Sequence, residues 1–211
     1  MPEFAKFDDG FALGGHDGGV IADGEYVLKL WQPGTNGETE AAFLQSVGDH
    51  PVMSRFAVKY HGVREVAGEG DAAPSKWIMM ENLLFGMERP VSMDLKIGTR
   101  TYGDEASEKK RKDQEDKAMT STQGSLGIRV TGARLYNGSG LHLFGNKYKN
   151  EPSDEEEMRV ALRAFFAPPE VLAQVRKFVD EMVAVFEKQE ELAFYGSSLL
   201  FAYDTASRCK L

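Results

Sequence analysis

Residues 90–103 read Pro-Val-Ser-Met-Asp-Leu-Lys-Ile-Gly-Thr-Arg-Thr-Tyr-Gly, an alternating segment that carries two charged side chains among apolar ones. Alternation with a period of two predicts a β-strand whose successive side chains point to opposite faces. One face carries Val91, Met93, Leu95 and Ile97, and the other carries Ser92, Asp94 and Lys96. The Asp94 carboxylate and the Lys96 ammonium are then roughly 7 Å apart along one face. Gly98 ends the strand, where a backbone without a side chain lets a ligand approach closely.

The strand pattern leaves two interpretations of Asp94 and Lys96 open. Taken alone, it favours a half-buried ion pair on the solvated face of an antiparallel strand. The wider spacing favours a binding or catalytic site, because Pro90, Asp94, Lys96 and Gly98 spell P-x-x-x-D-x-K-x-G. This pattern resembles the signature of the inositol polyphosphate kinase family. The resemblance extends from about Gly14, in a Gly-Gly-His motif, to Asp204.

Composition limits the classes of protein that the chain can belong to. Its 211 residues with 42% hydrophobic content can bury one core, or two small lobes that share a cleft. A single cysteine, Cys209, excludes an internal disulfide and suits a reducing compartment. No apolar run reaches membrane-spanning length, so we expect a soluble intracellular protein, cytoplasmic or nuclear. The net charge of −8 argues against general binding to nucleic acid or anionic membranes.

Lys29 lies in a strand-like segment, residues 26–31, on the same face as Val27 and Trp31. A lysine there either extends from an edge strand to solvent or needs a partner. By analogy with the lysine of protein kinases, it would hold nucleotide phosphates. Glu40 begins a helical pattern eleven residues later and could pair with Lys29. The resembling family carries a similar Glu-x-x-Phe at this point, which favours the functional interpretation.

Residues 76–80 form a short apolar run that ends in Glu81-Asn82-Leu83. An ordinary strand that ends in a loop would explain these residues equally well. In a kinase-like fold, however, this place is the hinge that binds adenine. The resemblance therefore implies that Glu81 and Leu83 contribute main-chain contacts to ATP.

Residues 104–117 form a mixed charge run, which is usually a solvated helix face. On a helix, Lys109, Lys110 and Lys117 fall within roughly 100° of one another, although Asp113 interrupts them. The resembling family uses this helix to line its inositol phosphate pocket. The resemblance implies substrate contacts from Arg100, Lys109 and Lys110. The local sequence around these residues is most similar to the inositol hexakisphosphate kinase branch.

Residues 127–136 alternate as a strand and lead through Asn137-Gly138-Ser139-Gly140, a hairpin turn, into residues 141–144. Lys147-Tyr148 follows as in the resembling family, and Lys147 becomes another substrate-binding candidate. Asn150-Glu151 then stands where the family has Gly-Arg, so an expected phosphate-binding arginine is missing. A capping box of Ser153 and Glu156 predicts a helix over 154–166, and a second helix follows Pro168-Pro169. Each helix carries an apolar stripe along one face, which we expect to belong to the core.

Residues 194–204 contain Ser197-Ser198-Leu199-Leu200 and resemble a strand near the family's catalytic centre. In the family an Ile-Asp-Phe segment follows, and its aspartate holds magnesium. No such segment occurs before Leu211, so we expect a truncated C-terminus and assign no residue of this chain to the metal. Asp204 belongs to the strand motif and is a poor substitute.

Together these patterns predict a two-lobed α+β kinase with antiparallel sheets and an ATP cleft between an N-lobe, about 10–83, and a C-lobe, about 84–211. Lys29 and Glu40 would belong to the ATP site, where Lys29 would hold the phosphates. Asp94 would contact nucleotide or substrate hydroxyls, and Lys96 would contact the phosphate that is transferred. ATP and Mg²⁺ are the implied cofactors. The preferred substrate is inositol hexakisphosphate. A trisphosphate kinase, a multikinase, and a non-catalytic inositol phosphate-binding protein remain the alternatives, and the oligomeric state is not indicated.

Overall fold

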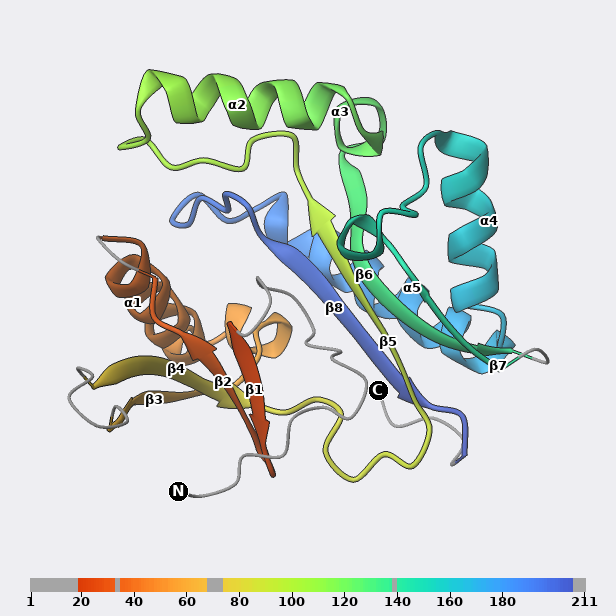
Figure 1. The fold of residues 1–211 in the computed structure, drawn as a ribbon, viewed down its shortest axis with the longest axis horizontal. Coiled ribbons are helices and arrows are strands. Elements are labelled where there is room, and N and C mark those ends of the chain that lie inside the picture. The colour runs from red at the N-terminus through yellow and green to blue at the C-terminus, as the bar shows by residue number, and fades with distance from the viewer. Residues whose placement is uncertain (1–18, 33–34, 68–73, 138–139, 207–211) are drawn as a thin grey trace. The chain divides into compact units, whose positions relative to one another are not determined.

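A computed structural model of the chain describes residues 19–32, 35–67, 74–137 and 140–206. The Gly-Gly-His motif at residues 14–16 and Cys209 lie outside this part. The chain divides into two compact units, Met1–Phe85 and Gly86–Leu211. Both appear in Figure 1, the first in red to yellow and the second in yellow-green to blue. Among the described residues, no helix has the length and apolar character needed to cross a membrane.

The first unit is built on an antiparallel sheet with strand order β1-β2-β4-β3. Its strands are β1 (Val20–Asp23), β2 (Tyr26–Leu30), β3 (Tyr60–Val66) and β4 (Ser75–Glu81), with α1 (Thr35–Asp49) and η1 (Met53–Phe56) between β2 and β3. Ala41 and Leu44 of α1 pack with Ile78 of β4 in a small apolar cluster. This packing fixes α1 against the sheet that carries Lys29.

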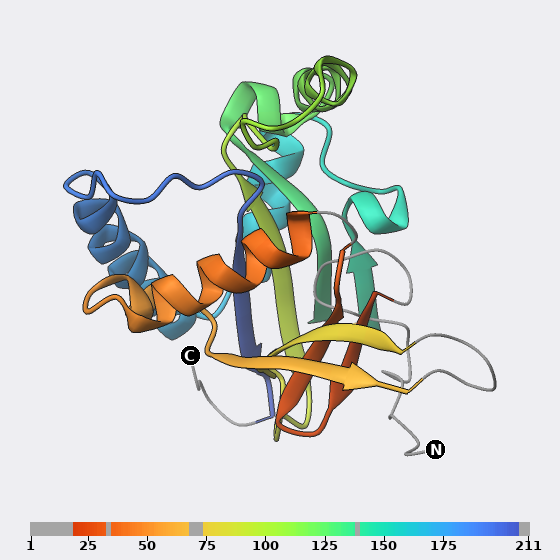
Figure 2. The same cartoon turned by 90° about the vertical axis from the view of Figure 1, so that its left-hand side faces the viewer.

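The second unit is built on an antiparallel sheet with strand order β7-β6-β5-β8. Its strands are β5 (Pro90–Ile97), β6 (Ile128–Asn137), β7 (Gly140–Phe144) and β8 (Ser198–Asp204). Its helices are α2 (Glu108–Met119), α3 (Thr122–Leu126), η2 (Asn146–Tyr148), α4 (Glu155–Phe165) and α5 (Pro169–Phe186). The strand predicted around Asp94 is β5, and the predicted hairpin is β6–β7. Figure 2 shows α2 and α3 beyond the end of the sheet where β5 finishes.

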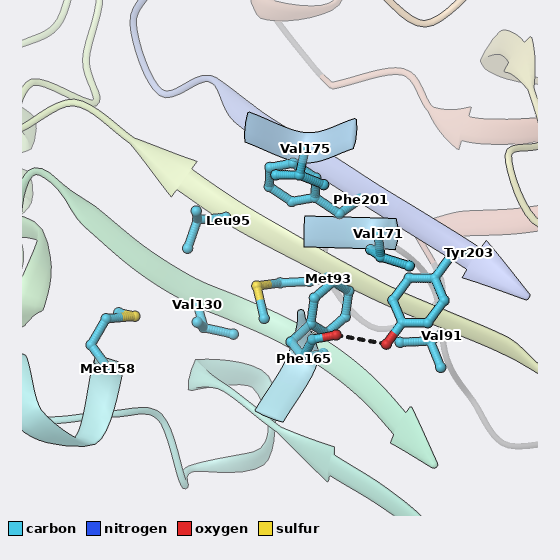
Figure 3. Packing of buried hydrophobic residues seen from close by; sticks show 11 residues of the cluster. Val91, Met93, Leu95, Val130, Met158, Phe165, Val171, Val175, Phe201 and Tyr203 are labelled. Atoms are coloured by element: carbon cyan, nitrogen blue, oxygen red, sulfur yellow. Dashed lines mark hydrogen bonds between the residues drawn. The ribbon is translucent and has the colours of Figure 1, made fainter. Parts of the chain in front are cut away.

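Helices α4 and α5 cover one face of the second sheet. Val91 and Met93 of β5 are fully buried there, together with Phe165 of α4 and Val171 of α5 (Figure 3). The predicted apolar faces of β5, α4 and α5 are thereby confirmed. The predicted capping box is wrong by one residue, because Asp154 caps α4 by accepting a hydrogen bond from the Glu157 amide. The acid that bonds back to the start of the helix is Glu157, one residue after the expected Glu156. Its carboxylate accepts hydrogen bonds from the amide and the hydroxyl of Ser153, which places the cap at Asp154.

Tyr203→Phe is expected to destabilise the protein by about 1–3 kcal/mol, the cost of leaving a buried acceptor unpaired. The Tyr203 hydroxyl donates a 2.6 Å hydrogen bond to the Phe165 carbonyl at the end of α4, drawn as the dashed line in Figure 3. The last carbonyls of a helix have no partner within the helix. Chemical denaturation measures the change. Tyr195→Phe, at a residue 39% exposed, is the control, and a loss below about 0.5 kcal/mol for Tyr203→Phe contradicts this role.

Candidate functional site

Lys29 and Glu40 form an ion pair in the first unit. The Lys29 ammonium, on β2, lies 2.5 Å from Glu40 Oε1, on α1. Each side chain is 30% exposed, so the pair is half-buried and still accessible. The predicted pairing is confirmed, and it holds the ammonium of the candidate nucleotide-binding lysine in a defined place.

The predicted hinge follows the end of β4. The Glu81 amide donates a 2.9 Å hydrogen bond to the Lys59 carbonyl, and Glu81 Oε1 accepts a 3.1 Å bond from the Lys59 amide. Because the amide of Glu81 is engaged within the first unit, an adenine contact from this residue would use its carbonyl. Asn82 holds the exit from β4 through a 3.0 Å hydrogen bond from the Leu84 amide. Leu83 lies in this turn, so its adenine contact stays a prediction.

Asp94 lies on β5, on the face opposite the apolar core of the second unit. Its side chain is nevertheless buried, with 6% exposure, and Ser92 beside it is fully buried. The expectation of a half-buried pair on a solvated face is therefore wrong for Asp94, because both faces of β5 are covered at this point. Within the described residues, Asp94 Oδ1 and Ser92 Oγ have no hydrogen-bond partner. A buried acceptor without a partner is costly, and a ligand hydroxyl would remove that cost.

A β-bulge lies beside Asp94. Asp94 pairs with Gly132 of β6, whereas Leu95 pairs with Val130, so Thr131 is the extra residue. The Thr131 hydroxyl donates a 3.1 Å hydrogen bond to the Asp94 carbonyl. Gly145 packs so closely on Gly132 that an added Cβ would lie 2.9 Å from its backbone. Bulges frequently occur next to active sites, where they redirect a side chain.

Lys96 lies two residues after Asp94 and is half-buried. Its ammonium donates a 3.4 Å hydrogen bond to the Gly196 carbonyl. Its cross-strand partners are Arg129 on β6 and Ser198 on β8, and directly opposed residues share one face of a sheet. Arg129 is therefore a second cation beside Lys96, and it is 6% exposed. Sequence analysis missed Arg129, although the alternation of residues 127–136 could have placed it on the polar face of its strand.

Arg100 is engaged with its own surroundings. Its guanidinium pairs with Asp104 and donates a 3.0 Å hydrogen bond to the Tyr102 carbonyl. It also lies over the Tyr195 ring, at 4.0 Å from the centroid. The hydrogen bond with Asp104 is the largest of the effects that raise the pKa of Arg100. A phosphate that binds Arg100 would therefore have to displace Asp104, and the predicted substrate contact stays a prediction.

Lys109 and Lys110 lie in the first turn of α2, which confirms the predicted helix. Ser107 caps it by accepting a 3.3 Å hydrogen bond from the Lys110 amide. Both lysine side chains are exposed and able to meet a ligand. Lys147 belongs to η2, but its side chain lies outside the described part of the chain, so its predicted contact is not placed.

The Asp204 carboxylate is hydrogen-bonded to backbone amides of its own unit. It accepts hydrogen bonds of 3.0, 3.0 and 2.9 Å from the amides of Glu88, Arg89 and Ala206. Among the residues that the structure describes, no three His, Cys, Asp or Glu side chains gather as metal ligands. Kinases hold Mg²⁺ with one or two carboxylates and nucleotide phosphates. The described residues do not supply a metal cage, so no residue of this chain is assigned as a ligand of Mg²⁺.

The family model for inositol polyphosphate kinase matches residues 77–210, which is more than half of the chain. The chain belongs to the inositol polyphosphate kinase family. Human inositol hexakisphosphate kinase 2 is 42% identical over 139 residues, which cover 63% of this chain and 33% of the relative. Rat inositol hexakisphosphate kinase 1 is 37% identical over 141 residues, 61% of this chain and 31% of the relative. The chain thus spans about a third of the length of these family members.

A solved structure supports the fold. Inositol phosphate multikinase Ipk2 of S. cerevisiae, in complex with ADP and Mn²⁺, aligns with a TM-score of 0.65 at 24% identity. The alignment covers 86% of this chain and 75% of that protein. The predicted family and the α+β fold with antiparallel sheets are confirmed. The roles predicted for individual residues stay predictions.

Proposed function

We propose that this chain transfers a phosphoryl group from ATP to an inositol polyphosphate, preferably inositol hexakisphosphate, to give a diphosphoinositol phosphate. The observation that carries the proposal is the polar face of β5. There the signature strand places a buried carboxylate oxygen of Asp94, which has no hydrogen-bond partner among the described residues, on the same face as Lys96 and Arg129. Similarity to inositol hexakisphosphate kinases supports the preference for the hexakisphosphate.

The proposed step is an in-line displacement at the γ-phosphorus of ATP. A bond forms between that phosphorus and an oxygen of the acceptor, and the bond to the bridging oxygen breaks, with its electron pair leaving on ADP. Lys29, held by Glu40, would bind the nucleotide phosphates. Asp94 would accept a hydrogen bond from a nucleotide hydroxyl, or from a ring hydroxyl when a lower inositol phosphate is the acceptor, and Lys96 would neutralise charge on the transferred group. Mg²⁺ bound with ATP would neutralise phosphate charge.

A single cysteine and the use of an inositol phosphate suit an intracellular site, cytoplasmic or nuclear. An inositol polyphosphate is the proposed partner. The negative net charge supports the expectation that neither nucleic acid nor membrane is a partner.

A non-catalytic inositol phosphate-binding protein is the second candidate. Two observations favour it: Glu151 stands where the resembling family has arginine, and Asp204 is committed to three backbone amides. Incubation of the chain with Mg-ATP and a panel of inositol tris- to hexakisphosphates separates the two. A product that carries a diphosphate group, identified by ³¹P NMR, supports the hexakisphosphate kinase. A product from a lower phosphate alone indicates a trisphosphate kinase or multikinase, and binding without any product supports the second candidate.

Lys29→Ala is expected to raise the Kd for ATP by about tenfold or more, because a charge-assisted contact to phosphate is lost. Stability should change by less than about 1 kcal/mol, since half-exposed ion pairs contribute little. Isothermal titration with ATP measures the first effect. Lys76→Ala is the matched control, because Lys76 is an exposed lysine on the neighbouring strand that lies over Trp31. Equal ATP affinity in wild type and Lys29→Ala would remove Lys29 from the proposed site.

A further inference from the structure

Glu151 and Arg129 form an ion pair in the second unit whose two facing atoms are buried. Arg129 Nε lies 3.8 Å from Glu151 Oε2, and the two side chains are 7% and 26% exposed. Both atoms are buried, and neither has a hydrogen-bond partner in the part of the chain that the structure describes. A buried pair without hydrogen bonds recovers little of the cost of removing its charges from water. Stability alone therefore gives little reason for this pair.

The backbone holds Glu151 in this position through Asn150. The Asn150 side-chain amide donates a 3.0 Å hydrogen bond to the Leu143 carbonyl, and its oxygen accepts a 3.1 Å bond from the Gly145 amide. Lys149 has a left-handed backbone, with φ of 57°, which turns the chain into this arrangement. The two residues that replace the expected Gly-Arg thus act together, because Asn150 fixes the loop that presents Glu151 to Arg129.

The surroundings of Glu151 are cationic. Arg129 is the cross-strand partner of Lys96, and the Lys117 ammonium on α2 acts on Glu151 through its charge. Burial raises the pKa of Glu151, and Arg129 and Lys117 lower it by less. A carboxylate therefore occupies a place where two cations would otherwise be available to an anionic group, close to the lysine proposed to meet the transferred phosphate.

We propose that Glu151 is a specificity-determining residue of the acceptor site, which keeps a phosphate of the inositol ring away from Arg129. Its Oε2, which has no hydrogen-bond partner among the residues that the structure describes, suits a ring hydroxyl, because a hydroxyl can donate a hydrogen bond that a phosphate oxygen cannot. Glu151 thus reduces the advantage of the hexakisphosphate over acceptors that carry a hydroxyl at the contacted position. The inference rests on the proposed function, because it places Arg129 in the acceptor site.

Titration calorimetry without ATP tests the proposal with inositol hexakisphosphate and inositol trisphosphate as probes. Glu151→Gln is expected to tighten binding of the hexakisphosphate by about tenfold and of the trisphosphate by less than about threefold, because a repulsive charge is removed next to a phosphate. Glu190→Gln makes the same change in net charge at an exposed position. It should alter either affinity by less than about twofold, since distant surface charges are screened.

A double-variant cycle assigns the effect to Arg129. Adding Arg129→Gln should abolish the gain of Glu151→Gln, and thermal unfolding confirms that each variant is folded. Arg129→Lys replaces Arg129→Gln if the latter does not fold, and there a reduced gain is expected. Unchanged affinity in Glu151→Gln, an equal gain for both probes, or an equal gain in Glu190→Gln overturns the inference.

The same measurements separate this inference from the proposed function. Tighter hexakisphosphate binding by Glu151→Gln without any phosphorylated product would support the inference and reject the kinase activity. Product formation by the wild type, with no effect of Glu151→Gln on inositol phosphate binding, would support the kinase activity and reject the inference. If neither wild type nor Glu151→Gln binds an inositol phosphate, both are rejected.

Discussion

Lys96→Ala is expected to lower the rate of phosphoryl transfer by about 10²- to 10³-fold, the usual cost of removing one group that stabilises transition-state charge. The Lys96 ammonium lies on the polar face of β5, opposite Arg129 and two residues from Asp94. The apolar core uses the other face of this strand. The substitution therefore removes a charge from the proposed site without opening a cavity in the core.

The measurement is single-turnover transfer from labelled ATP to inositol hexakisphosphate, together with thermal unfolding of the same samples. Lys177→Ala is the control, because that lysine is 80% exposed on α5 and should leave the rate unchanged. Near wild-type transfer by folded Lys96→Ala would refute the assignment of β5 as the reacting strand. Loss of transfer together with loss of the folded state would show a structural role for Lys96 instead.

Asp204→Ala is expected to destabilise the second unit by about 3–5 kcal/mol, because three backbone amides lose a charged acceptor at once. The carboxylate accepts hydrogen bonds from the amides of Glu88 and Arg89, which lead into β5, and from Ala206 after β8. It is 4% exposed, so water cannot easily replace it. Asp204 thus ties the start of the central strand to the end of its neighbour.

Urea denaturation measures this loss. Asp180→Ala, at an exposed position of α5, makes the same change of residue and should stay within about 0.5 kcal/mol of wild type. A loss below about 1 kcal/mol for Asp204→Ala would show that its hydrogen bonds contribute little. Asp204 would then be available for another role, including the metal contact for which it is a poor candidate here.

Local sequence patterns predicted the elements that carry the site. Alternation in residues 90–97 predicted β5, and the apolar stripes predicted α4 and α5, because side-chain period follows directly from backbone geometry. The pairing of Lys29 with Glu40 was also predicted, since a charged residue among apolar ones needs a partner. The signature around Asp94 was enough to identify the family before any fold was known.

By itself, then, the sequence determined the family, the α+β class and the strand that carries Asp94 and Lys96. Only the tertiary structure decided that Asp94 is buried, that Arg129 lies beside Lys96, and that Glu151 forms an ion pair with Arg129. The physical reason is that periodicity reports which face of a strand a residue takes, but not which distant residue lies beside it. Register between strands, the bulge at Thr131 and the loop held by Asn150 depend on contacts between segments far apart in the chain.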